Sequence, residues 1–147
     1  GDEIFPDGVD ENNPNITAGF LHFVDFSDLD NPVEVAKYEL PGQGSHNYWI
    51  EDDILYVAMY GGGVRIVDIS GDLLGDLYRQ GREIGYIMTG TANGYIPNAT
   101  MSWGAQLYKG YVFYSDWNSG LGSSKVSELK PDNSKANQYI NKTPIID

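Results

Sequence analysis

Short segments in which apolar and polar residues alternate recur along most of the chain. A period of two is the pattern of β-strands, because successive side chains of a strand point to opposite faces of the sheet. The segments predicted as strands are residues 20–26, 33–40, 47–50, 54–60, 64–69, 83–88, 105–108 and 111–115. Helical spacing is confined to Leu73, Leu74, Leu77 and Tyr78, which predict one short helical turn. The pattern therefore predicts an all-β protein.

The strand pattern also repeats. Residues 62–70 echo residues 19–27 at a distance of 43 residues, and residues 46–64 align without a gap on residues 103–121 at a distance of 57. Self-similarity at roughly 40 to 45 residues with strand-like content is typical of β-propeller blades. We therefore expect about three four-stranded β-propeller repeats, at residues 1–41, 42–100 and 101–129, followed by an extended or disordered tail at residues 130–147.

Three repeats are fewer than a closed propeller contains, since propellers typically close with about 4 to 8 blades. The first repeat also has no counterpart of residues 46–57, so it begins near its third strand. We therefore expect the chain to belong to a larger propeller, or to complete its sheets with a protein partner. Either way, at least one sheet edge should lack a partner within the chain or pair with another chain.

Composition narrows the classes of function. The net charge of the 147-residue chain is −12, from 21 acidic and 9 basic residues, which argues against nucleic acid as a partner. No apolar run is long enough to span a bilayer. Cysteine is absent, which excludes disulfides and thiolate zinc sites but does not place the chain in the cytosol. A sequence rich in Asn, Ser, Gly and Tyr favours an extracytoplasmic location.

Several segments resemble a known family. Residues 45–57 followed by 63–70, with the run Val64-Arg65-Ile66-Val67-Asp68, are similar to the repeats of the LVIVD-repeat family of bacterial and archaeal secreted β-propeller proteins. Residues 19–32, 71–84, 103–104 and 115–121 are similar to other parts of these proteins. The resemblance implies an extracytoplasmic propeller, usually longer than this chain and often surface-anchored, with no reaction firmly assigned. The chain departs from the pattern at residues 122–125, where an aromatic and apolar strand would be expected.

Aromatic residues at the starts of blades and at hairpin tips are the candidates for ligand binding. His46 and its repeat counterpart Trp103 should begin innermost strands and point toward a central channel. Trp49, Tyr60 and Trp117 lie in comparable places. Exposed aromatic rings can stack on sugars or dock proteins. The alternative for the four Trp and Tyr residues is packing between blades, and for His46 it is a hydrogen-bonded structural role at a blade junction. A single histidine does not make a transition-metal site.

Four residues are predicted to have structural roles. Asp25 and Asp68 occupy matching positions, each at the end of an apolar strand, and should accept backbone N–H bonds from the turn that follows. Gly63 and Gly120 match each other at the repeat distance of 57 residues and should supply the positive φ of hairpin turns.

One polar loop is a candidate cation site. Asp7, Asp10 and Asn12 place oxygen donors close together in sequence, and calcium prefers six to eight oxygen ligands. The spacing does not match the EF-hand pattern, so a solvated turn is the alternative. No other cofactor is indicated.

The leading hypothesis is a non-catalytic extracytoplasmic β-propeller module that mediates protein or glycan binding at the cell surface. The first alternative is a metal-assisted propeller hydrolase or lyase that acts on a polysaccharide or phosphoester. The nucleophile motif G-x-S-x-G is absent from the sequence. The second alternative is a structural subunit of a surface assembly, which would complete an open sheet by strand addition.

Overall fold

The computed structural model describes residues 1–3 and 19–126, and this part of the chain is built from strands and turns without a helix. The prediction of an all-β protein is confirmed.

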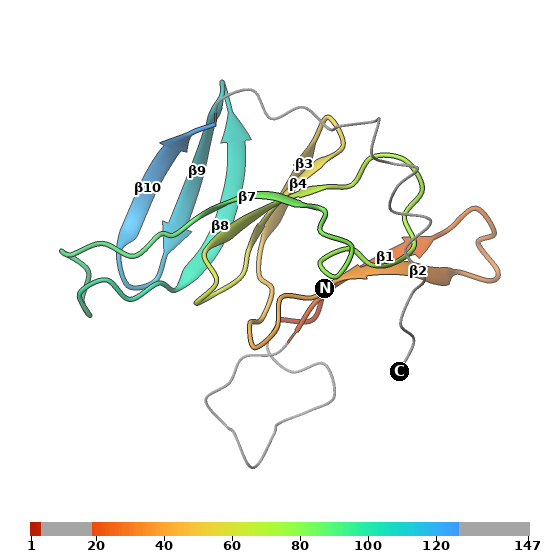
Figure 1. Cartoon of the computed structure of the whole chain (residues 1–147), viewed down its shortest axis with the longest axis horizontal. Helices are drawn as coiled ribbons and strands as arrows, with labels where there is room; N and C mark the ends of the chain where they lie inside the picture. The colour runs from red at the N-terminus through yellow and green to blue at the C-terminus, as the bar shows by residue number, and fades with distance from the viewer. Residues whose placement is uncertain (4–18, 127–147) are drawn as a thin grey trace, which may run out of the picture.

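The strands form three sheets that follow one another across the molecule (Figure 1). The first sheet contains β1 (Leu21–Asp25), β2 (Val33–Tyr38) and β6 (Gly75–Asp76). The middle sheet contains β3 (Tyr48–Glu51), β4 (Ile54–Ala58), β5 (Val64–Asp68) and β7 (Glu83–Ile87). The third sheet contains β8 (Ser102–Tyr108), β9 (Tyr111–Asp116) and β10 (Gly120–Lys125).

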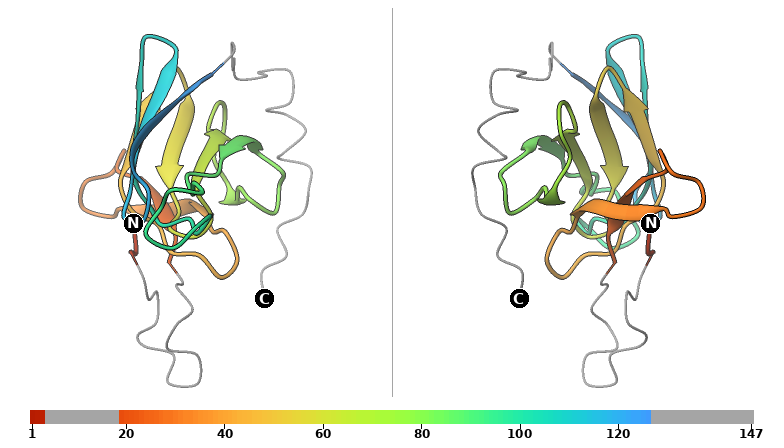
Figure 2. Two further views of the ribbon diagram at one scale, coloured as in Figure 1. Left: turned by 90° about the vertical axis from the view of Figure 1, so that its left-hand side faces the viewer. Right: turned by 90° about the vertical axis from the view of Figure 1, so that its right-hand side faces the viewer.

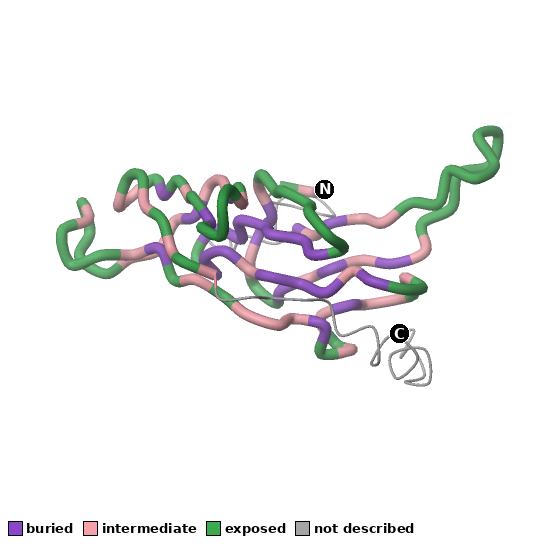
Figure 3. Tube along the Cα trace, turned by 90° about the horizontal axis from the view of Figure 1, so that it is seen from above, coloured by how far each residue is buried: buried purple, intermediate pink, exposed green. Residues whose placement is uncertain are grey.

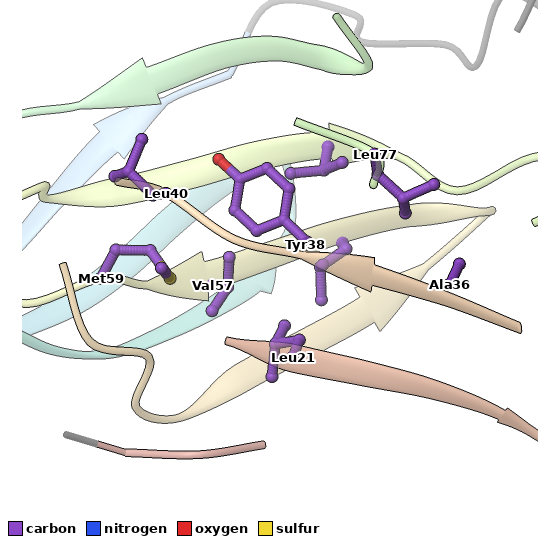
Figure 4. Close-up of a cluster of buried hydrophobic side chains, with 9 residues drawn as sticks. Leu21, Ala36, Tyr38, Leu40, Val57, Met59 and Leu77 are labelled. Atoms are coloured by element: carbon purple, nitrogen blue, oxygen red, sulfur yellow. The ribbon is translucent and has the colours of Figure 1, made fainter. Parts of the chain in front are cut away.

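The two central strands of the middle sheet, β4 and β5, are buried on both faces, whereas its edge strand β3 is exposed at all four positions. Leu55 and Val57 pack in one apolar cluster with Tyr38 of the first sheet, part of which is drawn in Figure 4. Ile54 and Tyr56, which alternate with them along β4, pack in a second cluster with residues of the third sheet. Strand β4 is therefore apolar at every position, because each face of its sheet meets another sheet. Figure 3 shows the buried residues along these central strands and the exposed ones mainly in the loops.

The first two sheets are joined by a polar contact as well. The buried Tyr38 hydroxyl donates a hydrogen bond of 2.6 Å to Glu83, which is also 3.0 Å from the Arg65 guanidinium. Burial, followed by the Glu83 contact, raises the pKa of Tyr38. The first sheet is also turned relative to the middle one, with β1 and β2 (orange in Figure 2) lying across the direction of β3 and β4.

The repeat of 43 residues is reproduced in the backbone. Strand β1 coincides with β5 in the alignment, and each contains the same irregularity. The pairing of β1 with β2 shifts register between Phe23 and Val24, and that of β5 with β7 shifts between Ile66 and Val67, which are the matching residues. The first and second repeats are thus similar in strand register and not only in composition.

The repeat of 57 residues is reproduced as well. The hairpin β3–β4 turns through Asp52 and Asp53, with φ of 51° and 58°, and the hairpin β8–β9 turns through Lys109 and Gly110, with φ of 50° and 78°. Two successive residues with positive φ are typical of the type I′ turn that suits a two-residue hairpin.

Gly63 and Gly120 have φ of 76° and 85°, which side chains rarely adopt. A Cβ atom on Gly63 would also lie 2.3 Å from the carbonyl oxygen of Ile87, whereas nothing lies within 4 Å of one on Gly120. Gly63 therefore satisfies a conformational and a steric requirement, and Gly120 only the first.

Residues 71–82 differ from expectation. The predicted helical turn over Leu73–Tyr78 is absent, and this prediction was wrong. Instead β6 pairs in parallel with β2, and a turn follows in which Asp76 Oδ1 accepts the backbone N–H of Tyr78 at 3.0 Å. Leu77 is buried in the first apolar cluster. Pairing with β2 and the side-chain cap fix the segment in an extended and then turned conformation.

Residues 122–125, where the sequence departs from the repeat pattern, nevertheless form part of β10. This strand pairs with β9 at six positions. Within the described residues β10 has a strand on one side only, whereas β5, its counterpart, lies between β4 and β7. The predicted tail at residues 130–147 lies outside the described residues.

The first residues occupy a place in the repeat that the sequence did not reveal. The Asp2 N–H donates to the Phe20 carbonyl at 2.8 Å, and the Met59 N–H donates to Gly63, the counterpart of Phe20, at the same distance. Asp2 therefore corresponds to Met59, and Glu3 corresponds to Tyr60. The Ser45 hydroxyl also donates to the Asp2 carbonyl at 2.8 Å.

His22 ties these residues to the first sheet. Its Nε2 is 2.9 Å from Asp2 Oδ2, and its Nδ1 is 2.6 Å from Glu34 Oε2. The hydrogen bond to Glu34 is the largest cause of the raised pKa of His22, and it outweighs the opposing effect of burial.

Asp25 and Asp68 occupy matching turns. Asp25 Oδ1 accepts the Ser27 N–H at 2.7 Å, and Asp68 Oδ1 accepts the Ser70 N–H at 2.8 Å. The two sites differ in exposure, because Asp68 is fully buried and Asp25 is exposed.

We expect Asp68→Ala to lower the free energy of unfolding by about 1 to 3 kcal/mol, the cost of a buried donor without a partner. Asp25→Ala should cost less, because water can replace the exposed carboxylate. Urea unfolding followed by circular dichroism measures both values. Equal losses, or no loss at Asp68, would contradict the buried brace.

Candidate functional site

Four of the five aromatic candidates come together at one junction of the repeats. His46 precedes β3, and its counterpart Trp103 lies at the start of β8. Tyr60 follows β4, and its counterpart Trp117 follows β9. Each of two repeats thus contributes one ring from the start of its first strand and one from the end of its second strand. We call these four residues the aromatic ladder.

The rings of the ladder are in sequential contact. The His46 and Trp103 ring centroids are 3.8 Å apart, and Tyr60 meets both rings edge-on at 5.7 and 5.5 Å. Trp117 stacks on Trp103 with a centroid distance of 4.6 Å and an interplanar angle of 25°. Offset stacking and edge-to-face contact are the favoured geometries of aromatic pairs.

Glu3, which is itself exposed, contacts the ladder at the buried Tyr60 and at His46. The Tyr60 hydroxyl donates to Glu3 Oε1 at 2.5 Å, and His46 Nε2 lies 3.5 Å from the same oxygen. Burial, followed by the Glu3 hydrogen bond, raises the pKa of Tyr60. Glu3, Tyr60 and Trp117 hold matching places in the three repeats. The sequence did not single out Glu3, because the register that identifies it appears only in the backbone hydrogen bonds.

The backbone fixes the ladder between the middle and third sheets. The Ser102 N–H donates to the Tyr60 carbonyl at 2.9 Å, and the Asn47 N–H donates to the Trp103 carbonyl at 3.3 Å. The Trp117 N–H donates to the Met101 carbonyl at 2.8 Å. The rings therefore extend from backbone segments that are paired with one another, and this pairing fixes their positions within the chain.

The ladder is buried at one end and open at the other. Tyr60 is buried, whereas Trp117 is 73% exposed. Asn118 holds the loop of residues 91–99 beside it, with Oδ1 accepting the Ile96 N–H at 2.7 Å and Nδ2 donating to the Ile96 carbonyl at 2.8 Å. Tyr95 and Ile96 of this loop are exposed. We call Trp117, Tyr95 and Ile96 the apolar patch.

Asp116, the buried acid next to Trp117, is saturated with internal hydrogen bonds. It accepts the Thr89 hydroxyl and the backbone N–H groups of Met101, Asn118 and Ser119. Burial by itself would raise the pKa of Asp116, but these hydrogen bonds outweigh it and hold that pKa below its usual value. The carboxylate therefore links the surrounding turns to one another, and its hydrogen bonds are all made within the chain.

Trp49, the fifth candidate, lies apart from the ladder. Its Nε1 is 3.3 Å from Glu51 Oε2. It lines a cleft of about 460 Å³ together with Asn47, Tyr48, Gln106, Phe113 and Ser115.

The proposed calcium ligands Asp7, Asp10 and Asn12 lie outside the described residues, so calcium binding stays a prediction. Within residues 1–3 and 19–126 no group of three or more His, Asp or Glu side chains is arranged to hold a metal ion. The same part of the chain contains no helix long and apolar enough to cross a membrane.

Comparisons with protein-family models, with curated proteins and with solved structures found no match to this chain. The interpretation of the site therefore depends on its own geometry.

The two tryptophans of the ladder should differ in their contribution to stability. Trp103→Ala removes contacts with three rings, and we expect it to cost about 2 to 4 kcal/mol in the free energy of unfolding. Trp117→Ala removes one aromatic pair, which is worth about 0.5 to 1.5 kcal/mol. Urea unfolding of both variants checks the order, and a larger loss for Trp117→Ala would contradict it.

Proposed function

We propose that the chain is a non-catalytic, extracytoplasmic β-propeller module that binds a protein or glycan partner at the open end of the aromatic ladder. The single observation behind this proposal is the 73% exposure of Trp117 on a ring stack whose other members are held by paired strands. A large exposed aromatic ring that is already fixed in position loses little conformational entropy on binding.

A protein partner is favoured over a glycan by the polar groups around Trp117. Sugars are oriented by polar groups that are free to hydrogen-bond with them. Beside Trp117, however, Asp116 and Asn118 use their hydrogen bonds within the chain, and the Ser119 hydroxyl accepts the Thr91 N–H. The apolar patch lies exposed beside these groups, and tryptophan and tyrosine are enriched at the energetic centres of protein interfaces.

Charge adds a second property of the partner. The chain carries a net charge of −12, so a partner with basic residues near the contact would be attracted over long range. This contribution should weaken as salt concentration rises.

The extracytoplasmic location and the membership of the LVIVD-repeat family are parts of the same proposal. They are supported by the resemblance of residues 45–57 and 63–70 to that family, and by the composition rich in Asn, Ser, Gly and Tyr. The matching strand registers of the repeats are consistent with propeller blades.

A peptide display library selected on the immobilised chain tests the binding proposal. We expect selected peptides with basic and aromatic residues, whose titration changes the fluorescence of the native chain. Trp117→Ala should raise their dissociation constants at least about 30-fold, as expected for a central interface residue. Leu29→Ala, at an exposed apolar residue in the β1–β2 turn, is the matched control and should leave binding unchanged.

Titration with neutral oligosaccharides such as cellohexaose and chitohexaose forms the second arm. We expect no response. A saturable response that Trp117→Ala abolishes would assign the site to glycans. Peptides that bind equally well to the Trp117 variant, together with no glycan response, would contradict the proposed site.

A further inference from the structure

The third sheet has one apolar face that no other described residue covers. Along β9, Val112 and Asp116 are buried, whereas Tyr111 and Phe113 are exposed on the opposite face. Tyr108 of β8 is the strand partner of Tyr111, and Leu121 of β10 lies on the same side, opposite Ser115. We call Tyr108, Tyr111, Phe113 and Leu121 the outer face.

The repeat shows what such a face contacts elsewhere in the molecule. At a distance of 57 residues, Tyr111, Phe113 and Leu121 correspond to Ile54, Tyr56 and Val64 of the middle sheet. Those three middle-sheet residues are 2%, 2% and 0% exposed, because the third sheet packs on them. Their counterparts on the outer face are 42%, 42% and 81% exposed. The outer face therefore has the character of a sheet-packing surface without its sheet.

The opposite end of the molecule has the complementary surface. Val24 of β1 corresponds to Val67 of β5, which packs against the first sheet and is fully buried. Val24 is itself 40% exposed, and Phe26, which follows β1, is 58% exposed. The free face of the first sheet thus has apolar residues at the positions through which the middle sheet packs on the first sheet.

We infer that the outer face binds the free face of the first sheet of a second copy of this chain. The contact would repeat the one already formed between successive sheets within the chain. Two copies placed head to tail would bring together six sheets, which lies within the range of about 4 to 8 at which propellers close. A head-to-tail contact produces a closed ring when the rotation between units closes, and an open filament when it does not.

The cleft beside Trp49 fits this arrangement. Phe113 and Leu121 line it and also belong to the outer face. A second sheet packed on the outer face would cover this side of the cleft, so the cleft is part of an interface between sheets. The inference does not depend on the function of the aromatic ladder.

The mass of the native chain in solution, measured by sedimentation over a range of concentrations, tests the inference. We expect a dimer of the 16.3 kDa chain. Phe113→Lys on the outer face and Val24→Lys on the first sheet should each raise the dissociation constant of the dimer at least about 30-fold, because both place a charge in the same contact. Tyr86→Lys, at an exposed position on β7 of the middle sheet, is the matched control and should remain dimeric.

Circular dichroism and thermal melts establish that each variant is folded. Leu121→Lys, at a more exposed position, replaces Phe113→Lys if that variant does not fold. Mixing folded Phe113→Lys and Val24→Lys chains should restore a dimer held by one intact contact.

Two results would overturn the inference. A native chain that stays monomeric at every concentration would show that no second copy covers the outer face. A Val24→Lys chain that dimerises while Phe113→Lys does not would show two outer faces packed on each other. Assemblies that keep growing with concentration, and that both lysine variants abolish, would support the same head-to-tail contact in its open form.

Discussion

The packing of sheets on both faces of the central strands β4 and β5 determines the arrangement of the other sheets. Strand β4 is buried at each of its five positions, with Leu55 and Val57 packed on the first sheet and Ile54 and Tyr56 packed on the third. A strand of this kind is stable only between two covering sheets, because either face alone would expose a large apolar surface to water. The flanking sheets, their order and the apolar faces at both ends of the molecule all follow from this requirement.

The aromatic ladder follows from the same repeat. The packing of the third sheet on the middle sheet brings the start of β8 beside the residues that follow β4, as the hydrogen bond between Ser102 and Tyr60 shows. Large rings at these matching positions therefore meet whenever neighbouring sheets pack in register. The location of these ring positions thus follows from how the sheets pack, whereas the exposed indole of Trp117 is particular to the third repeat. We consider this combination of a fixed position and a variable residue suited to binding.

The sequence was sufficient for the features that depend on local pattern. Alternation identified eight of the strands, and the two repeat distances placed the hairpin turns and the matching pairs of ladder residues.

Features that depend on long-range pairing were not predictable. Strand β6 pairs with a strand of another repeat through two residues, which leaves no periodic signal. The role of Glu3 depends on the backbone contact of Asp2 with Phe20, across residues that show no repeat in sequence. The position of Trp49 outside the ladder was missed because residue type and nearness to the start of a repeat do not say to which side of a strand a ring points.

Hydrogen exchange of backbone amides tests whether β4 and β5 are held between two sheets. Strands covered on both faces open only when the neighbouring sheets separate from them, so their amides should exchange most slowly. We expect the slowest exchange in β4 and β5, with faster exchange in β1 and β10. Amides of β4 that exchange as fast as those of β10 would show that β4 is not held between two sheets.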